Sequence, residues 1–339
     1  MLIGNRSWLF ENRPVITSTG VVGGPFEKKG KLTADFHSFS DDLWFGEDSY
    51  EKAQKKFLEE ACHEALNQGN LQKEDIQFIF AGDLLNQITS TSFACRSLSI
   101  PYFGLFGACS TSMEALALAA FIVNGKGANN VITGSASHNA AVEKTFRYPT
   151  EYGSQKPPTS QWTVTAAGVG VVSSSGTGPI VTSATIGKVI DEGLKDPYNM
   201  GGAMAPAAVD TIKAHFEDRS LPEDYYDLIL TGDLGKIGHA VALELFQNEN
   251  MQIDQNSFQD AGLMIYNEEQ PVQSGASGAG CSAAVTYGHI YNRLKQGELN
   301  KVLIVATGAL LSPLTFQQQE SIPCIAHAVS IERQGGFVQ

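Results

Sequence analysis

The sequence has few cysteines and no long apolar run. Its five cysteines are scattered, and no two of them form a Cys-x-x-Cys pair. This distribution argues against a disulfide framework and against a zinc site of the usual spacing, and it is typical of a reducing compartment. The most apolar run, residues 115–123, has nine residues, whereas a membrane-crossing helix needs about 20. Charged residues such as Arg6 and Glu11 interrupt the N-terminal stretch, so we expect neither a signal peptide nor a transmembrane segment.

Positive charge is also scarce. The chain has 23 Lys and Arg residues against 36 Asp and Glu residues, which gives a formal net charge of −13. An excess of acid on this scale argues against nucleic-acid binding and against direct contact with anionic lipid. The 339 residues, 42% of them hydrophobic, suffice for one large core or for two joined half-domains.

Three short patterns occur twice, in the same order. They are VITST at 15–19 with IVTSA at 180–184, FIFAGDL at 78–84 with LILTGDL at 228–234, and GACS at 107–110 with AGCS at 279–282. The spacing between copies differs from pattern to pattern, which indicates loop insertions in a duplicated half rather than a tandem solenoid. We therefore predict two similar halves, residues 1–178 and 179–339, joined near the turn residues 175–179.

Apolar periodicity supports an α/β arrangement in each half. The patterns predict helices over 52–67, 113–124, 204–218 and 283–295, and strands over 76–81, 130–133, 164–173, 228–231, 302–306 and 324–331. Alternating strands and helices predict a mainly parallel sheet covered on both faces. The helices that follow Cys109 and Cys281 are apolar enough to lie buried between the two halves.

Cys109 stands between a predicted strand and one of these buried helices. Gly107 permits a sharp turn, and Ser110 or one of the two hydroxyl residues after it can cap the helix. Free N–H groups and the positive dipole end at a helix N-terminus favour the thiolate, the nucleophilic form. On spacing alone, Cys109 is either a functional thiol or a small buried hydrophobe.

Two resemblances follow from these residues. The stretches GACS at 107–110, VITG at 131–134 and VLIVATGA at 302–309 resemble the thiolase and ketoacyl-synthase superfamily. A closer resemblance, to the stage V sporulation protein AD family of endospore-forming bacteria, is carried by AGDLLNQ at 81–87, FGACSTSME at 106–114, FRYPTEYG at 146–153, MAPAA at 204–208 and SIPCIAH at 321–327.

The first resemblance implies an α/β, thiolase-like fold, with two similar halves, mixed sheets and helices in stacked layers. It also implies an acyl group on Cys109 and, by analogy, a homodimer. The second implies that the protein binds dipicolinic acid and takes part in its uptake into the developing spore, alongside integral membrane proteins of the same sporulation operon. The expected location is the cytoplasmic side of the spore inner membrane, held there peripherally through partners.

The sequence departs from the condensing enzymes of this superfamily. Such enzymes need two further groups beside the cysteine, typically His with His or Asn, to polarise a carbonyl and stabilise an oxyanion. The strand 228–231 is followed by Gly232 and Asp233, and His239 comes later, on an expected helix. The Gly-rich turn 274–281 has neither Asn nor His. We therefore expect a binding pocket without turnover, and keep an acyltransferase that uses Cys109 as the alternative.

Several further residues are candidates for the pocket. A bidentate Arg suits a planar carboxylate and a Tyr ring can stack on a pyridine, so Arg147 and Tyr148 are the first choice, ahead of Lys156. Ser135 and His138 follow a strand at the carboxyl edge of the sheet, although a surface loop would explain them equally well.

The remaining candidates are polar residues on or after strands. His327 lies in the last strand, where a hydrogen-bonded core histidine is the alternative. Asp83 and Asp233 can either shape the pocket or cap a helix. The motif GASGAG at 275–280 resembles a dinucleotide loop, but no acidic residue follows at the right distance, so we expect no cofactor.

Overall fold

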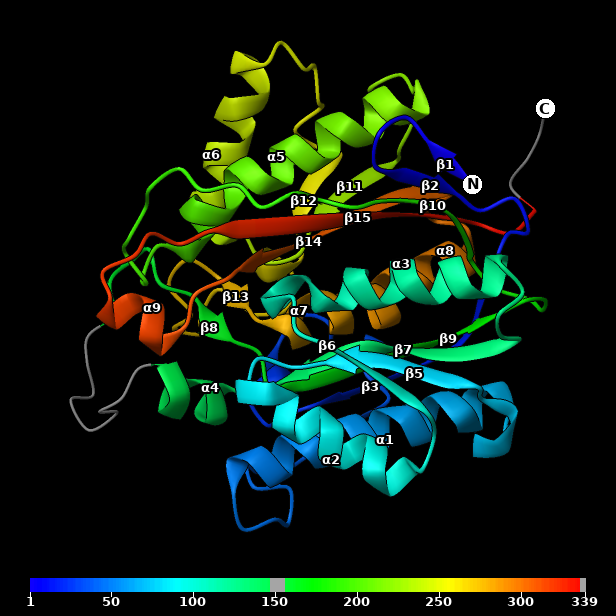
Figure 1. Ribbon diagram of the computed structural model, residues 1–339. Helices are drawn as coiled ribbons and strands as arrows, with labels where there is room; N and C mark the ends of the chain where they lie inside the picture. Colours follow the sequence, from blue (N-terminus) through cyan, green and yellow to red (C-terminus); the bar gives the residue numbers. More distant parts are fainter. Residues whose placement is uncertain (147–155, 336–339) are drawn as a thin grey trace.

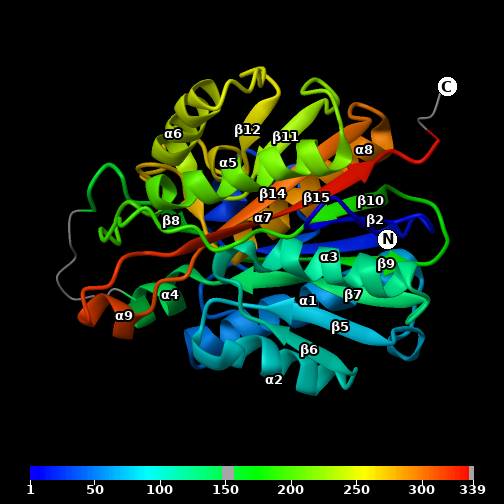
Figure 2. The ribbon, with the colours of Figure 1, turned by 45° about the horizontal axis from the view of Figure 1, so that its top comes forward.

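The computed structural model describes residues 1–146 and 156–335. Its helices and strands stack in alternating layers, with helices outside both sheets and a helical layer between them (Figure 1). Figure 2 shows the same two sheets, with α1 and α2 on the outer face of one and α5 and α6 on the outer face of the other. The two halves therefore share a central helical layer, as the apolar helices predict.

Both sheets have the same strand order. In the first half the order is β3-β9-β7-β5-β6, and in the second it is β10-β15-β14-β11-β12. The bounds are β3 Val15–Gly23, β5 Phe78–Gly82, β6 Tyr102–Leu105, β7 Asn130–Ser137, β9 Ala166–Ser173, β10 Ile180–Thr185, β11 Leu228–Thr231, β12 Phe258–Asp260, β14 Lys301–Ala309 and β15 Cys324–Glu332. A single residue pair, Ile180 with Val15, joins the two sheets.

The pairing directions repeat as well. β7, β5 and β6 are parallel to one another, as are β14, β11 and β12. β9 pairs antiparallel with β3 and β7, and β15 pairs antiparallel with β10 and β14. The sheets are therefore mixed, and the expectation of a mainly parallel sheet holds only for these three strands of each half. The predicted division after residue 178 falls in the connection between β9 and β10.

The helices repeat in the same way. α1 (Tyr50–Gly69) packs on the outer face of the first sheet, and α5 (Met200–Arg219) packs on that of the second. The other helices are α2 Thr89–Leu98, α3 Thr111–Asn124, α4 Asn139–Phe146, α6 Gly235–Asn248, α7 Ala279–Ala284, α8 Tyr291–Gln296 and α9 Pro313–Gln317. A π-helix, Val285–Ile290, links α7 to α8.

The hydrophobic core follows the layers. The central cluster contains the apolar face of α3 with Cys281, Ala283 and Tyr287 from the segment after β13 (Ala276–Ser277). Met113, Leu116 and Tyr287 of this cluster are fully buried. Separate clusters hold α1 and α2 on one sheet and α5 and α6 on the other. No helix within the described ranges is both long and apolar enough to cross a bilayer.

Candidate functional site

Cys109 lies in a tight turn at the start of α3. The turn is a short 3-10 helix, Ala108–Ser110, between β6 and α3. The left-handed residue is Ala108, with φ 52°, whereas Gly107 has φ −91°. The sharp turn expected at Gly107 is present, but its left-handed residue is the next one, Ala108. A Cβ on Gly107 would lie 2.5 Å from Glu114 Oε2, the end of a flexible side chain that can move away.

The hydroxyl residues after Cys109 bond to the turn rather than cap the helix. Ser110 is the N-cap residue of α3, but its side chain makes no capping bond. Its hydroxyl donates instead to the Gly107 carbonyl at 2.6 Å. Thr111 Oγ1 accepts from Gly107 N and donates to the Ala108 carbonyl. These bonds hold the turn closed, and Ser110 is buried inside it.

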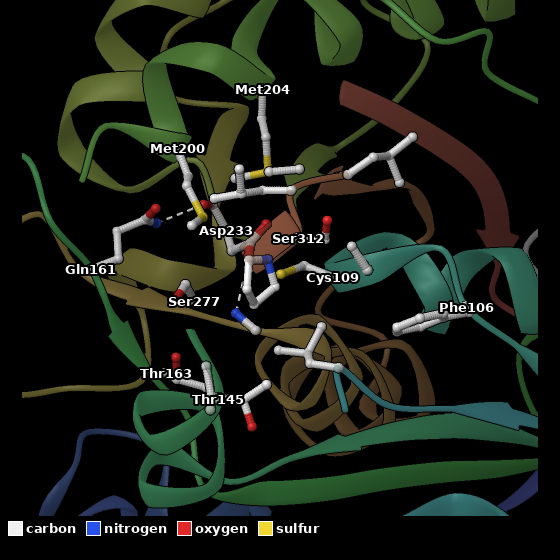
Figure 3. Close-up of a pocket in the computed structure, with 18 of the residues that line it drawn as sticks. Phe106, Cys109, Thr145, Gln161, Thr163, Met200, Met204, Asp233, Ser277 and Ser312 are labelled. Atoms are coloured by element: carbon white, nitrogen blue, oxygen red, sulfur yellow. Dashed lines mark hydrogen bonds between the residues drawn. The ribbon is translucent and has the colours of Figure 1, made fainter. Parts of the chain in front are cut away.

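A cavity of about 640 Å³ opens on Cys109. It lies between the two halves, with Met200 and Met204 on one side of Cys109 and Thr145 and Thr163 on the other (Figure 3). Its lining residues are Leu84, Asn86, Phe106, Ala108, Cys109, Val142, Thr145, Gln161, Thr163, Met200, Met204, Asp233, Ser277, Gly278, Ala309, Leu310, Leu311, Ser312, Pro313 and Leu314. The walls are mainly apolar, and none of these residues is a Lys, Arg or His.

Asp233 is the acidic group of this cavity, and its carboxyl is buried. Oδ2 accepts from Gly278 N at 3.0 Å, and Oδ1 accepts from Thr307 Oγ1 at 2.7 Å. The Cys109 side chain lies beside this carboxyl group (Figure 3). Burial raises the pKa of Asp233 to about 6. Asp233 therefore shapes the pocket and does not cap a helix.

The same contacts change the expected state of Cys109. Burial, and then the neighbouring Asp233 carboxylate, raise the pKa of the Cys109 thiol well above its usual range, and the Gly278 N–H only partly opposes this. The expectation that the helix N-terminus favours a thiolate is therefore wrong, because burial and an acidic neighbour outweigh the helix dipole. At neutral pH the pocket holds a thiol rather than a ready nucleophile.

The two stretches where condensing enzymes would place their helper groups, residues 232–235 and 274–281, disfavour a larger side chain at Gly232 and at Gly278. A Cβ on Gly278 would lie 2.9 Å from Ser137 Oγ, and Gly278 has φ 101°. A Cβ on Gly232 would lie 3.1 Å from Ala306 Cα. His239 lies on α6, as expected, and its Nε2 is 3.1 Å from the Phe258 carbonyl. Within the described part of the chain, no imidazole lines the Cys109 cavity.

The other polar candidates are held in internal bonds away from the cavity. Ser135 Oγ donates to the Ala279 carbonyl at 2.8 Å. His138 is buried, with Nε2 2.8 Å from the Leu43 carbonyl. His327 Nδ1 accepts from Gly187 N at 3.3 Å, and burial lowers its pKa to about 4. The structure does not bring Ser135, His138 or His327 to the lining of the cavity with Cys109.

Of the basic and aromatic candidates, the structure describes Lys156 but not Arg147 or Tyr148. Arg147 and Tyr148 lie outside the described residues, so their role stays a prediction. Lys156 forms an ion pair with Glu143 at 2.8 Å, and its Nζ lies 4.8 Å from the centre of the Trp162 ring. Asp83 accepts from Leu85 N and from Thr91 N and Oγ1, and thereby anchors α2.

Sequence reasoning missed several lining residues. Gln161 Nε2 donates to the Asp233 carbonyl at 2.6 Å and to the Ala276 carbonyl at 3.1 Å, and so ties the two sides of the site together. Met200 and Met204 stand one turn apart at the start of α5. The i, i+4 spacing of two flexible apolar side chains at a helix start is the one signal in the sequence that could have indicated them.

The repeated halves and the cysteine at the start of a buried central helix define a thiolase-like protein. Among solved structures, the chain is similar to 3-oxoacyl-[acyl-carrier-protein] synthase III from Aquifex aeolicus VF5, with a TM-score of 0.57 and 15% identity over 94% of this chain and 99% of that one. It is also similar to a form of OleA from Xanthomonas campestris, with a TM-score of 0.62 and 12% identity over 95% of this chain and 99% of that one. At these identities the likeness shows the fold alone.

The family is shown by sequence. The model of the stage V sporulation protein AD (SpoVAD) family matches residues 4–332. A curated relative, the stage V sporulation protein AD of Bacillus subtilis (strain 168), is 47% identical over 335 residues, which are 99% of each chain. The chain therefore belongs to the SpoVAD family of sporulation proteins, as the closer resemblance implied.

Proposed function

We propose that this protein binds dipicolinic acid in the Cys109 cavity and takes part in its uptake into the developing spore. The observation that carries the proposal is a preformed, mainly apolar cavity in which a thiol lies beside a buried carboxyl group. Its volume of about 640 Å³ is within the usual range of small-ligand pockets, about 300–1,000 Å³. The family membership supplies the context of sporulation.

The cavity offers suitable surfaces for a flat ring with two carboxylates. Met200, Met204 and Phe106 can pack on the faces of a pyridine ring. The side chains of Ser277 and Thr163 make no hydrogen bond to another described residue and can donate to a carboxylate. A balancing positive charge is left to Arg147, beyond the described residues.

We also propose that the pocket does not turn over a thioester. A condensing cycle needs a thiolate and two donors that stabilise a developing oxyanion. Here burial and Asp233 raise the pKa of the thiol, and residues 232–235 and 274–281, where the two helper groups are expected, contain neither His nor Asn. The alternative, an acyltransferase that uses Cys109, would require ionisation of the thiol beside a carboxylate.

The experiment separates the two functions. Isothermal titration calorimetry with dipicolinate should give saturable binding, whereas incubation with acyl-coenzyme A and malonyl donors should give no ketoacyl product. Product formed catalytically and lost in Cys109→Ala would overturn the binding proposal. Slow single acylation of Cys109 would not, because a thiol can be modified without a cycle.

The membrane role is proposed to depend on integral membrane proteins of the same sporulation operon, at the cytoplasmic side of the spore inner membrane. The net charge of −13 disfavours direct contact with anionic lipid. Tight binding of the pure protein to protein-free anionic vesicles would contradict this.

A homodimer is proposed along β6. This strand ends the first sheet, and the side chain of Phe103 on it is 53% exposed. Phe106, just beyond the strand, is also 53% exposed. An open strand edge with exposed rings is a surface on which a second copy can add a strand.

A further inference from the structure

The two repeat-related aspartates make different bonds although they follow equivalent strands. Asp83 follows β5 and Asp233 follows β11, each in a Gly-Asp-Leu sequence. In the first half, Asp83 Oδ1 accepts from the backbone N–H of Leu85 at 2.7 Å, and Oδ2 accepts from Thr91 N at 2.8 Å. Both oxygens of the Asp83 carboxylate are therefore hydrogen-bonded to its own loop and to the following helix.

In the second half, another residue anchors the equivalent loop. The backbone N–H that corresponds to Leu85 N belongs to Gly235, and it donates to Asp260 Oδ1 at 3.0 Å. Asp260 Oδ2 accepts from Leu234 N at 2.8 Å and from Thr231 Oγ1 at 2.7 Å. Asp260 is buried at the end of β12, so water does not compete for these bonds.

The register of the edge strands explains the difference. Thr231 of β11 pairs with Asp260 of β12. The equivalent residue of β5, Ala81, pairs with Gly104 of β6. Glycine has no side chain to accept the N–H groups of the loop, so the first half must use Asp83 itself.

We propose that Asp260 is a positioning residue: it anchors the 232–235 loop in place of Asp233 and thereby leaves the Asp233 carboxylate for the Cys109 thiol. The groups that face Asp233 are the Cys109 thiol before α3, the Thr307 hydroxyl on β14, the Gly278 N–H before α7, the Cys281 thiol on α7 and Asp260 itself. The proposal concerns the pocket of the proposed function, but it holds whatever ligand the pocket takes.

The test follows the Cys109 thiol without any ligand. The rate of alkylation by iodoacetamide is measured from pH 6 to pH 10, with the modified peptides quantified by mass spectrometry. The other cysteines, Cys62, Cys95, Cys281 and Cys324, are buried and report any general opening. Both carboxylate oxygens of Asp260 accept from loop N–H groups, whereas the amide of Asp260→Asn has only one oxygen. In either orientation of the amide, its N–H₂ group therefore faces a loop N–H. The anchor is broken, and Asp233 can turn away from Cys109.

The expected result is that alkylation of Cys109 at pH 8 rises about three- to tenfold in Asp260→Asn, with its pH profile moved to lower pH, since a tenfold change in thiolate corresponds to one pH unit. Loss of the Asp260 charge alone would act in the opposite direction, because a more readily ionised Asp233 would suppress the thiolate further. An unchanged or slower rate would overturn the proposal.

A matched control separates positioning from general destabilisation. Glu332→Gln removes another buried carboxylate, which accepts from Thr182 and Tyr225 and is not among the lining residues of the cavity, and it should lower the melting temperature without moving the Cys109 profile. Thr231→Val removes one bond to Asp260 Oδ2 and should give a smaller shift in the same direction, even if Asp260→Asn fails to fold. Alkylation of Cys281 as well, or a similar acceleration of Cys109 in the control variant, would show a merely structural role and overturn the proposal.

Discussion

The Asp233 carboxyl group and the Cys109 thiol lie beside each other in a mainly apolar cavity. An imidazole in this place would withdraw the proton and make a nucleophile, whereas a carboxylate leaves the proton on sulfur. We propose that the pair makes this position a polar part of a pocket wall rather than an acyl acceptor.

Replacement of Asp233 should make Cys109 more reactive. Asp233→Asn removes the negative charge beside the thiol, so the pKa of Cys109 should fall, and a fall of one unit gives about tenfold more thiolate at pH 8. The alkylation rate of Cys109 should rise accordingly. Thr307→Val, which removes only a donor to the carboxyl, serves as the control. A slower reaction in Asp233→Asn would show that the carboxylate activates the thiol.

Dipicolinate binding should strengthen as the pH falls. The pKa of Asp233 is raised by burial to about 6, so Asp233 is mainly ionised at pH 7 and repels an anionic ligand. If the protonated form binds, the apparent Kd should fall about tenfold between pH 7 and pH 5. Calorimetry at several pH values should show this slope in the native protein and a flatter one in Asp233→Asn. Affinity that rises with pH would contradict the proposed site.

Arg147 should supply the positive charge that the described walls lack. Arg147→Ala should weaken dipicolinate binding by about 1.5–3 kcal/mol, the range of a charged hydrogen bond, with nearly unchanged melting temperature. Lys156→Ala is the control, because Lys156 already pairs with Glu143 and should change the affinity little. Unaltered affinity in Arg147→Ala would remove that residue from the site.

The β6 edge should control self-association. Phe103→Lys places a charge on the exposed edge and should convert a dimer into a monomer in sedimentation velocity experiments. Phe121→Lys is the comparison, since Phe121 is also exposed, at 43%, but lies on α3. A native protein that is monomeric, or a dimer that survives Phe103→Lys, would contradict the proposed interface.

Local pattern was enough to predict most of the fold. The strand 228–231 is the same in sequence and structure, and the repeated motifs mark equivalent strands of the two sheets. The site was less predictable, because its parts come together only in three dimensions. Gln161 reaches the Asp233 carbonyl across 72 residues, and no periodicity reports such a bond.

The state of Cys109 was mispredicted for a related reason. A helix start favours a thiolate locally, but burial and Asp233 act from parts of the fold that the motif around Cys109 does not contain. Likewise, nothing near Asp233 in the sequence indicates that Asp260 would take over the anchoring of its loop. Charge and burial at a site are properties of the packed structure, whereas turn and strand patterns are local.

The central claim is that dipicolinic acid binds in the Cys109 cavity. The most direct test is calorimetric titration of dipicolinate into a variant whose cavity is filled and into a matched control. Thr145 on α4 lines the cavity, and its neighbour Lys144 is exposed on the same helix. Thr145→Trp should fill the cavity and weaken binding at least about tenfold, or 1.4 kcal/mol, whereas Lys144→Trp should bind like the native protein. Equal binding by both variants, or no binding by the native protein, would contradict the assignment of this cavity to dipicolinic acid.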